Sequence, residues 1–183
     1  MQNKKPILIY LILLGIVFYA KPVLSQQDYK GSVGVRFGYG VGITGTYNLQ
    51  NNQNLEFLLR YGYHGLVLNR PGANFQVLYE KHWPIRSSNF TVYVGAGPAI
   101  GVGKKFQESL YTYFALGVSP IVGFDYTIQN LKVPIILALD YKPTLNVDFP
   151  LNRRYEKVGV DFSYYELSFS VRVGIGRMYR RHR

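Results

Sequence analysis

The chain of 183 residues contains no cysteine. It therefore has no disulfide framework, no thiol nucleophile, no thiolate metal site and no lipidated N-terminal cysteine. Histidine is also scarce. His64, His82 and His182 lie far apart in the sequence, and we expect each to be solvated or hydrogen-bonded instead of binding a metal. The sequence predicts no metal site and no cofactor.

Long hydrophobic runs are scarce as well, although 48% of the residues are hydrophobic and the mean hydropathy is -0.03. An α-helical membrane protein would contain several runs of about 20 apolar residues. A membrane β-barrel distributes its apolar residues in alternation, so its mean hydropathy stays near zero. The composition is therefore compatible with a membrane barrel and argues against a helical membrane protein.

The longest apolar stretch lies at the N-terminus, where MQNKK and Pro6 precede a run from Ile7 to Ala20. Val23 and Ser25 are suitable residues at the −3 and −1 positions of a cleavage site. An uncleaved anchor helix is the alternative, but the run is shorter than the roughly 20 residues that a spanning helix needs. We expect residues 1–25 to be a cleaved signal peptide, and residues 26–183 to form one domain.

Strict alternation appears near the C-terminus, in YYELSFSVRVGI (Tyr164–Ile175). Every second residue is apolar, and the residues between them are polar, charged or glycine. Since side chains alternate between the two faces of a strand, this segment predicts a strand with one apolar and one polar face. Its apolar face has about the length that a tilted strand needs to cross a bilayer, roughly 9–11 residues.

The same pattern recurs and predicts eight strands. Their expected ranges are Val33–Gly40, Ile43–Leu49, Asn54–Tyr63, Ala73–Trp83, Phe90–Val102, Tyr111–Ile128, Lys132–Val147 and Tyr164–Gly176. For the first two, the glycines from Gly38 to Gly45 allow either a tight turn or one long kinked strand. The expected connections Gln50–Gln53, Pro84–Asn89 and Gln129–Leu131 are short, whereas His64–Gly72, Gly103–Leu110 and Asp148–Ser163 are longer. Short turns at one end and long loops at the other are typical of membrane barrels. We therefore predict an all-β fold, an eight-stranded antiparallel up-and-down transmembrane β-barrel.

Charged residues occupy the phase of each strand opposite to the apolar residues. This set comprises Arg36, Glu56, Arg60, Glu80, Asp125, Asp140, Lys142, Glu166 and Arg172. A soluble barrel of the lipocalin type would place apolar residues inside and charges outside. An eight-stranded barrel has an interior just wide enough for side chains to fill it. We therefore expect an interior network of ion pairs that plugs the barrel; acid–base catalysis by these carboxylates is the less favoured interpretation.

Two residues near the short-turn end suit a membrane interface. Lys81 lies on the outward phase beside Trp83, the single tryptophan. A tryptophan ring favours the headgroup region, and a lysine side chain can extend to water. We expect both to be interface anchors. Pro98 and Pro120 fit a closed ladder poorly, because proline cannot donate to it, and we expect them to face each other across a hairpin.

Basic residues are clustered in the segments expected as long loops. They include Lys104, Lys105, Arg153, Arg154 and Lys157. Such residues commonly keep a loop solvated. Facing an outer leaflet, they are also suited to charge-assisted contacts with the phosphates of lipopolysaccharide. Export argues against nucleic acid as a partner, despite the formal net charge of +11.

No catalytic motif is evident. The glycine-rich run from Gly95 to Gly101 lacks the spacing of a dinucleotide-binding loop, and Gly103-Lys104-Lys105 fails as a phosphate-binding loop. No histidine is accompanied by the acid and nucleophile that an outer-membrane lipid-modifying enzyme would need. We expect a non-enzymatic barrel with a structural or surface-interaction role. A narrow channel for water or small solutes, and a lipid-modifying enzyme, are the alternatives.

Several segments resemble small eight-stranded outer-membrane barrels, in the manner of the OmpA transmembrane domain and OmpX, and more closely the small barrels common in Bacteroidota. The segments are Gly34–Leu49, Asn54–Gly62, Leu78–Ile85, Tyr93–Gly101, Val122–Asn146 and Glu166–Val173. The resemblance implies a monomer in the outer membrane of a Gram-negative bacterium, exported through the periplasm and inserted by the barrel assembly machinery. Its motifs carry no catalytic assignment. Such chains often end on an aromatic residue of the last strand, whereas this one continues to Arg183.

Overall fold

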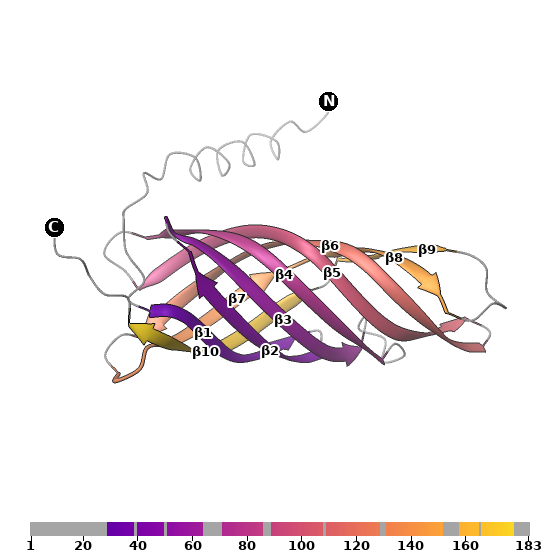
Figure 1. Cartoon of the computed structure of the whole chain (residues 1–183), viewed down its shortest axis with the longest axis horizontal. Coiled ribbons are helices and arrows are strands. Elements are labelled where there is room, and N and C mark those ends of the chain that lie inside the picture. Colours follow the sequence, from indigo (N-terminus) through magenta and orange to yellow (C-terminus); the bar gives the residue numbers. More distant parts are fainter. Residues whose placement is uncertain are drawn as a thin grey trace, which may run out of the picture.

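The computed structural model describes residues 29–38, 40–49, 51–63, 71–85, 89–107, 109–128, 131–151, 158–164 and 166–177. This part of the chain is all-β and forms a closed barrel of eight antiparallel strands (Figure 1), which confirms the predicted fold class and strand number. The expected signal peptide, His64 and His182 lie outside the described residues. In the described residues no helix is long and apolar enough to cross a membrane.

Ten labelled strands build the eight-stranded wall, because two wall strands are each interrupted once. The labelled strands are β1 (Tyr29–Gly38), β2 (Gly40–Asn48), β3 (Gln53–Tyr63), β4 (Pro71–Pro84), β5 (Phe90–Gln107), β6 (Ser109–Ile128), β7 (Ile135–Tyr141), β8 (Thr144–Pro150), β9 (Gly159–Ser163) and β10 (Leu167–Arg177). Both β7 and β8 pair with β6, so they form one wall strand. In the same way, β9 pairs with β8 and β10 pairs with β7, so β9 and β10 together form the last wall strand.

The barrel closes where β1 pairs with β10. The register can be traced once around the wall, beginning at Asp125 and passing through Arg36 and Arg60. The trace returns to β6 at Ala115, ten residues from its start. For eight strands this stagger corresponds to a strand tilt of about 40°. We call the end that carries Tyr29 and Arg177 the terminal end, and the opposite end, with the β5–β6 turn, the far end.

The shortest turns follow from residues that tolerate positive φ. Asn51 and Asn52, between β2 and β3, have φ of 61° and 58°, in the left-handed region that asparagine tolerates. At the far end, Gly38 pairs with Gly40, which has a φ of 125°. The first two strands therefore form a tight hairpin and not one long kinked strand.

One expected long loop is wrong. The segment Gly103–Leu110 is mostly strand, because β5 and β6 pair without interruption from Phe90 to Gln107. Gly103 lies opposite Tyr113 in this ladder. A Cβ at Gly103 would lie 2.6 Å from the Tyr113 hydroxyl oxygen, so glycine gives Tyr113 the room to cover this backbone. The last loop is also shorter than Asp148–Ser163, since β8 and β9 occupy both of its ends.

The two prolines do not face each other, contrary to expectation. Pro98 is opposite Val118, and Pro120 is opposite Ala96. The β4–β5 ladder is interrupted at Pro98, between the pairs Gln76–Ala99 and Tyr79–Ala96. On its side away from β5, β6 pairs with β7 and β8. This pairing is interrupted beside Pro120, in the gap between β7 and β8. Each proline therefore removes pairing on one side only, and the β5–β6 ladder between them stays complete.

The break between β9 and β10 is a β-bulge. Tyr141 is opposite Leu167, and Thr144 is opposite Ser163, so two residues on one strand face three on the other. The Lys142 N–H donates to the Glu166 carbonyl oxygen at 2.8 Å within this bulge. An extra residue reverses which side chains face outward: exposed positions are even in β9 and odd in β10. The bulge thereby directs Glu166 into the barrel.

Candidate functional site: a buried network of charges

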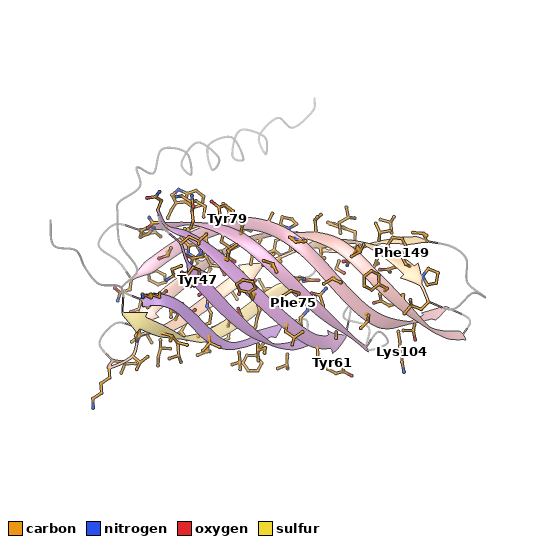
Figure 2. The ribbon with its side chains drawn as sticks, in the orientation of Figure 1. Tyr47, Tyr61, Phe75, Tyr79, Lys104 and Phe149 are labelled. Carbon is orange, nitrogen blue, oxygen red and sulfur yellow. The ribbon has the colours of Figure 1, made fainter. Side chains whose placement is uncertain are left out.

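The barrel places apolar side chains outside and charged side chains inside. Figure 2 shows Tyr47, Tyr61, Phe75, Tyr79 and Phe149 on the outer surface, and Tyr61 is 67% exposed. All nine charged residues of the expected interior set are buried; their exposures range from 0 to 6%. Lys142, Glu80 and Glu166 are at 0%. Buried charges are tolerated when they are paired and hydrogen-bonded, and the structure brings these nine into three connected layers.

The layer nearest the terminal end surrounds His82. Its Nε2 lies 3.0 Å from a Glu80 carboxylate oxygen, and its Nδ1 lies 3.6 Å from Asp125. Asn54 approaches the same Nε2 at 3.0 Å. Arg172 lies 3.8 Å from Asp125, so it closes the layer with a positive charge.

The middle layer is centred on Arg36. Its guanidinium donates to Glu56 at 2.8 Å and also contacts Asp140. The Thr44 hydroxyl donates to the same Glu56 oxygen, and the Tyr93 hydroxyl donates to Asp140 at 3.1 Å. Arg36 is therefore held between two carboxylates that come from opposite sides of the barrel, on β3 and β7.

The third layer lies toward the far end and contains Arg60, Lys142 and Glu166. Arg60 donates to both Glu166 oxygens, at 3.0 and 3.4 Å. The Lys142 Nζ lies 3.3 Å from Glu166 and donates to the Gln76 side-chain oxygen. One carboxylate thus serves two cations, which makes Glu166 the shared partner of this layer.

The layers are joined into a single network by residues that belong to two of them. Arg172 lies 3.9 Å from Glu56 as well as near Asp125. The Tyr93 ring stacks on His82 with a centroid distance of 4.9 Å, while its hydroxyl reaches Asp140. Other polar atoms, such as Nε of Arg36 and of Arg172, have no hydrogen-bond partner among the described protein atoms. Internal water commonly satisfies groups of this kind.

Sequence reasoning missed several members of the network, above all His82. We expected it to be solvated or hydrogen-bonded and left it out of the interior set. It is hydrogen-bonded, 2% exposed and central to its layer. Its position two residues after Glu80 on β4 gives it the same inward phase, so the alternation could have identified it. Tyr93, Gln76 and Asn54 are uncharged, and no sequence signal distinguished them from other inward residues.

The expected surface residues are only partly described. Lys81 is half-buried, and its Nζ donates to the Asn51 carbonyl oxygen. Trp83 is half-buried on the same strand, and Lys104 is exposed toward the far end. The backbone of Lys105 is described, but its side chain lies outside the described part, as do Arg153, Arg154 and Lys157.

The network has the chemistry of a structural plug. Each of the four cations of the network, Arg36, Arg60, Lys142 and Arg172, contacts at least one carboxylate. The hydroxyls of Thr44 and Tyr93 also donate to carboxylates. Within the described ranges, no three His, Cys, Asp or Glu side chains are grouped so that they could hold a metal ion. No protein-family model, no curated protein and no solved structure matches the chain.

Proposed function

We propose that this protein is a non-enzymatic, integral outer-membrane β-barrel with a plugged, charged interior, and that it serves a structural or surface-interaction role in the cell envelope. The observation that carries the proposal is the inverted distribution of side chains. Large apolar residues cover the outside, whereas nine charged residues are buried inside. A soluble barrel would have the opposite arrangement. An apolar exterior of this extent is typical of a surface that meets lipid or a protein partner.

The outer surface has dimensions that suit a bilayer. On β5 the outward row from Val92 to Val102 is apolar, and the next outward residue is Lys104. At a tilt of about 40° this row spans roughly 25 Å along the barrel axis, the height of the apolar band of outer-membrane barrels. Trp83 pairs with Val92 at the opposite limit of the row. The apolar band is therefore bounded by Lys104 at one end and by an interface-type aromatic residue at the other.

The interior argues for a plug in preference to an open pore. The three charged layers occupy the barrel from His82 to Glu166, and the members are almost fully buried. A charge facing the middle of a bilayer costs about 2–4 kcal/mol for Lys or Arg, while paired charges inside the barrel avoid this cost. Lys104 is exposed beyond the apolar band, which supports a contact with lipopolysaccharide phosphates as part of this proposal.

A first experiment tests location and closure together. The chain is expressed with residues 1–25 in a Gram-negative host, membranes are fractionated, and gel mobility is compared before and after boiling. We expect an outer-membrane band that shifts on boiling, because a closed barrel resists the detergent until heated. A soluble periplasmic product without a shift would contradict the proposal.

A matched pair of variants tests whether lipid covers the wall. Leu59 is 49% exposed on β3, within the apolar band. Leu59→Arg should lose the heat-shifted form, because it destabilises a lipid-facing site by about 2–4 kcal/mol. The same change on a soluble surface stays within about 0.5 kcal/mol. Lys104→Arg, beyond the band, is the control and should retain the shift.

A further inference from the structure

The charges of the three interior layers do not balance. The layers contain the five carboxylates of Glu56, Glu80, Asp125, Asp140 and Glu166 and the four cations Arg36, Arg60, Lys142 and Arg172. With all of these groups ionised, four positive and five negative charges leave a net charge of −1. The buried Asp148 on β8 lies outside the layers, toward the far end. A buried charge without a counter-charge is costly, so the network requires one more positive charge, and a proton can supply it.

The missing counter-charge belongs at Glu80. The other four carboxylates each lie 3.8 Å or less from an arginine or lysine nitrogen. Among the described residues, Glu80 forms no such ion pair, and the basic group beside it is His82, whose Nε2 lies 3.0 Å from one Glu80 oxygen. The other Glu80 oxygen has no hydrogen-bond donor among the described protein atoms. This arrangement suits the carbonyl oxygen of a neutral carboxylic acid better than a buried carboxylate, whose two oxygens both need donors.

The contacts of His82 indicate where the proton lies. Its Nδ1 faces an Asp125 carboxylate oxygen at 3.6 Å. A bare nitrogen would direct its lone pair at that negative charge, so the hydrogen of a neutral imidazole belongs on Nδ1. The Nε2 atom is then an acceptor, and the Asn54 amide, 3.0 Å away, can donate to it. Because an acceptor nitrogen and an ionised carboxylate have no hydrogen to share, the Glu80 oxygen beside Nε2 must carry one.

A charged imidazolium at His82 fits these contacts less well. It needs an acceptor at each nitrogen, whereas the distance of 3.6 Å from Nδ1 to Asp125 is too long for a hydrogen bond. Arg172 lies 3.8 Å from the same Asp125 oxygen, so a positive His82 would face this guanidinium across it. Lys81, the preceding residue on β4, adds a further positive charge. The geometry therefore favours a protonated Glu80 beside a neutral His82.

The titratable and charged groups around this pair come from several strands. They are Tyr29 and Arg36 of β1, Glu56 of β3, Lys81 of β4, Tyr93 of β5, Asp125 of β6 and Arg172 of β10. Glu56 interacts with Glu80, and the two carboxylates would repel each other if both were ionised. Glu56 is the one that keeps its negative charge, because Arg36 and Thr44 donate to it. The proton is therefore assigned to Glu80.

We propose that the plug includes a bound proton: Glu80 is a carboxylic acid in the folded barrel and donates to Nε2 of a neutral His82. With this proton the layers contain four cations and four carboxylates, so the network is electrically neutral. The site depends on interior contacts alone, and the inference therefore stands whether lipid or a protein partner covers the wall. It also links the barrel to pH, because loss of the proton leaves an unpaired charge in the interior.

Infrared spectroscopy detects the proton directly, because a protonated carboxyl group has a C=O stretching band apart from those of carboxylates. We expect this band in the folded wild-type protein at neutral pH. Glu80→Gln, whose neutral amide keeps the shape of the side chain, should lose it, whereas Asp161→Asn, which removes an acid of β9 outside the layers, should keep it. Absence of the band from the wild-type protein would overturn the proposal, whether or not the variants fold. A band that survives in heat-shifted Glu80→Gln would overturn the assignment to Glu80.

The pH dependence of unfolding provides an independent measurement. Unfolding exposes Glu80 to water, where a glutamate is ionised between about pH 6 and 8. The wild-type protein therefore releases a proton on unfolding that Glu80→Gln does not have. Relative to Glu80→Gln, its unfolding equilibrium constant should rise about tenfold for each pH unit in this range, so its stability falls as the pH rises. Urea titrations of both proteins across the range measure the difference, and an equal pH dependence would overturn the bound proton.

Discussion

Arg60 and Glu166 join two parts of the wall that are three strands and 106 residues apart, through hydrogen bonds of 3.0 and 3.4 Å. Both side chains are buried, so the pair lies in the barrel interior. Glu166 reaches this position because the bulge between β9 and β10 directs it inward. A break in strand register is thus linked to an ion pair that connects β3 with the last wall strand.

Glu166→Gln should destabilise the barrel strongly. The change leaves Arg60 and Lys142 buried without their shared carboxylate. Breaking a buried ion pair by removing one partner typically costs about 3–5 kcal/mol. Urea unfolding in phospholipid vesicles measures this loss, and Trp83, the single tryptophan, reports the transition. Lys104→Gln on the exposed surface is the control and should change stability by less than about 0.5 kcal/mol; a similar loss in both variants would contradict the role of Glu166.

Glu56 and Glu80 offer a second test, because the two buried carboxylates differ in their partners. Glu56 accepts from Arg36 and Thr44 and lies 3.9 Å from Arg172. Glu80 lies 3.0 Å from the His82 Nε2, a contact that carries opposite charges only when the imidazole is protonated. Glu56→Gln should therefore cost about 3 kcal/mol, whereas Glu80→Gln, which keeps an acceptor for its neighbours, should cost less than about 1 kcal/mol. The same urea titration decides, and the reverse order would refute this description of the network.

The inward and outward residues could be predicted from sequence because alternation has a period of two and the charges fall consistently in one phase. That pattern placed all nine charged residues of the interior set on one face. It could not give their partners, since which strand positions meet depends on the register and on a stagger of ten residues around the wall. Glu166 and Arg60 meet only through that stagger.

The errors have local physical causes. At Gly103 the sequence reads as a loop, but the glycine makes room for Tyr113 and the ladder continues. Equal spacing of Pro98 and Pro120 about Ser109 suggested that they face each other, yet the β5–β6 register is shifted by two residues from that symmetry. The bulge near Glu166 has no sequence signal of its own, because it depends on how the last two wall strands fit their neighbours.

Gly97 and Gly45 form a matched pair for the close approach of two strands. A Cβ at Gly97 would lie 1.8 Å from the Val77 carbonyl oxygen, beside the ladder break at Pro98, whereas a Cβ at Gly45 would meet nothing nearer than 3.8 Å. Gly97→Ala should therefore destabilise the barrel by more than about 2 kcal/mol, and Gly45→Ala should be neutral or stabilising by up to about 1 kcal/mol. A simple measurement is the heating temperature at which the gel mobility of each variant shifts. Equal behaviour of the two would mean that the backbones do not approach as closely as the structure shows.

Purified protein should produce no stable ion conductance in planar bilayers. An ion that passes through the barrel would have to separate Arg36 from Glu56 and Asp140, and Arg60 from Glu166, and each separation exposes buried charges. Insertion has to be shown independently, by the heat shift of protein recovered from the same vesicles. Otherwise a lack of conductance could result from a lack of inserted protein. Reproducible single-channel steps from inserted wild-type barrels would contradict the plug and favour the narrow channel. In that case Arg36→Gln should alter the ion selectivity of the steps, because Arg36 contributes a positive charge to the middle layer of any path along the axis.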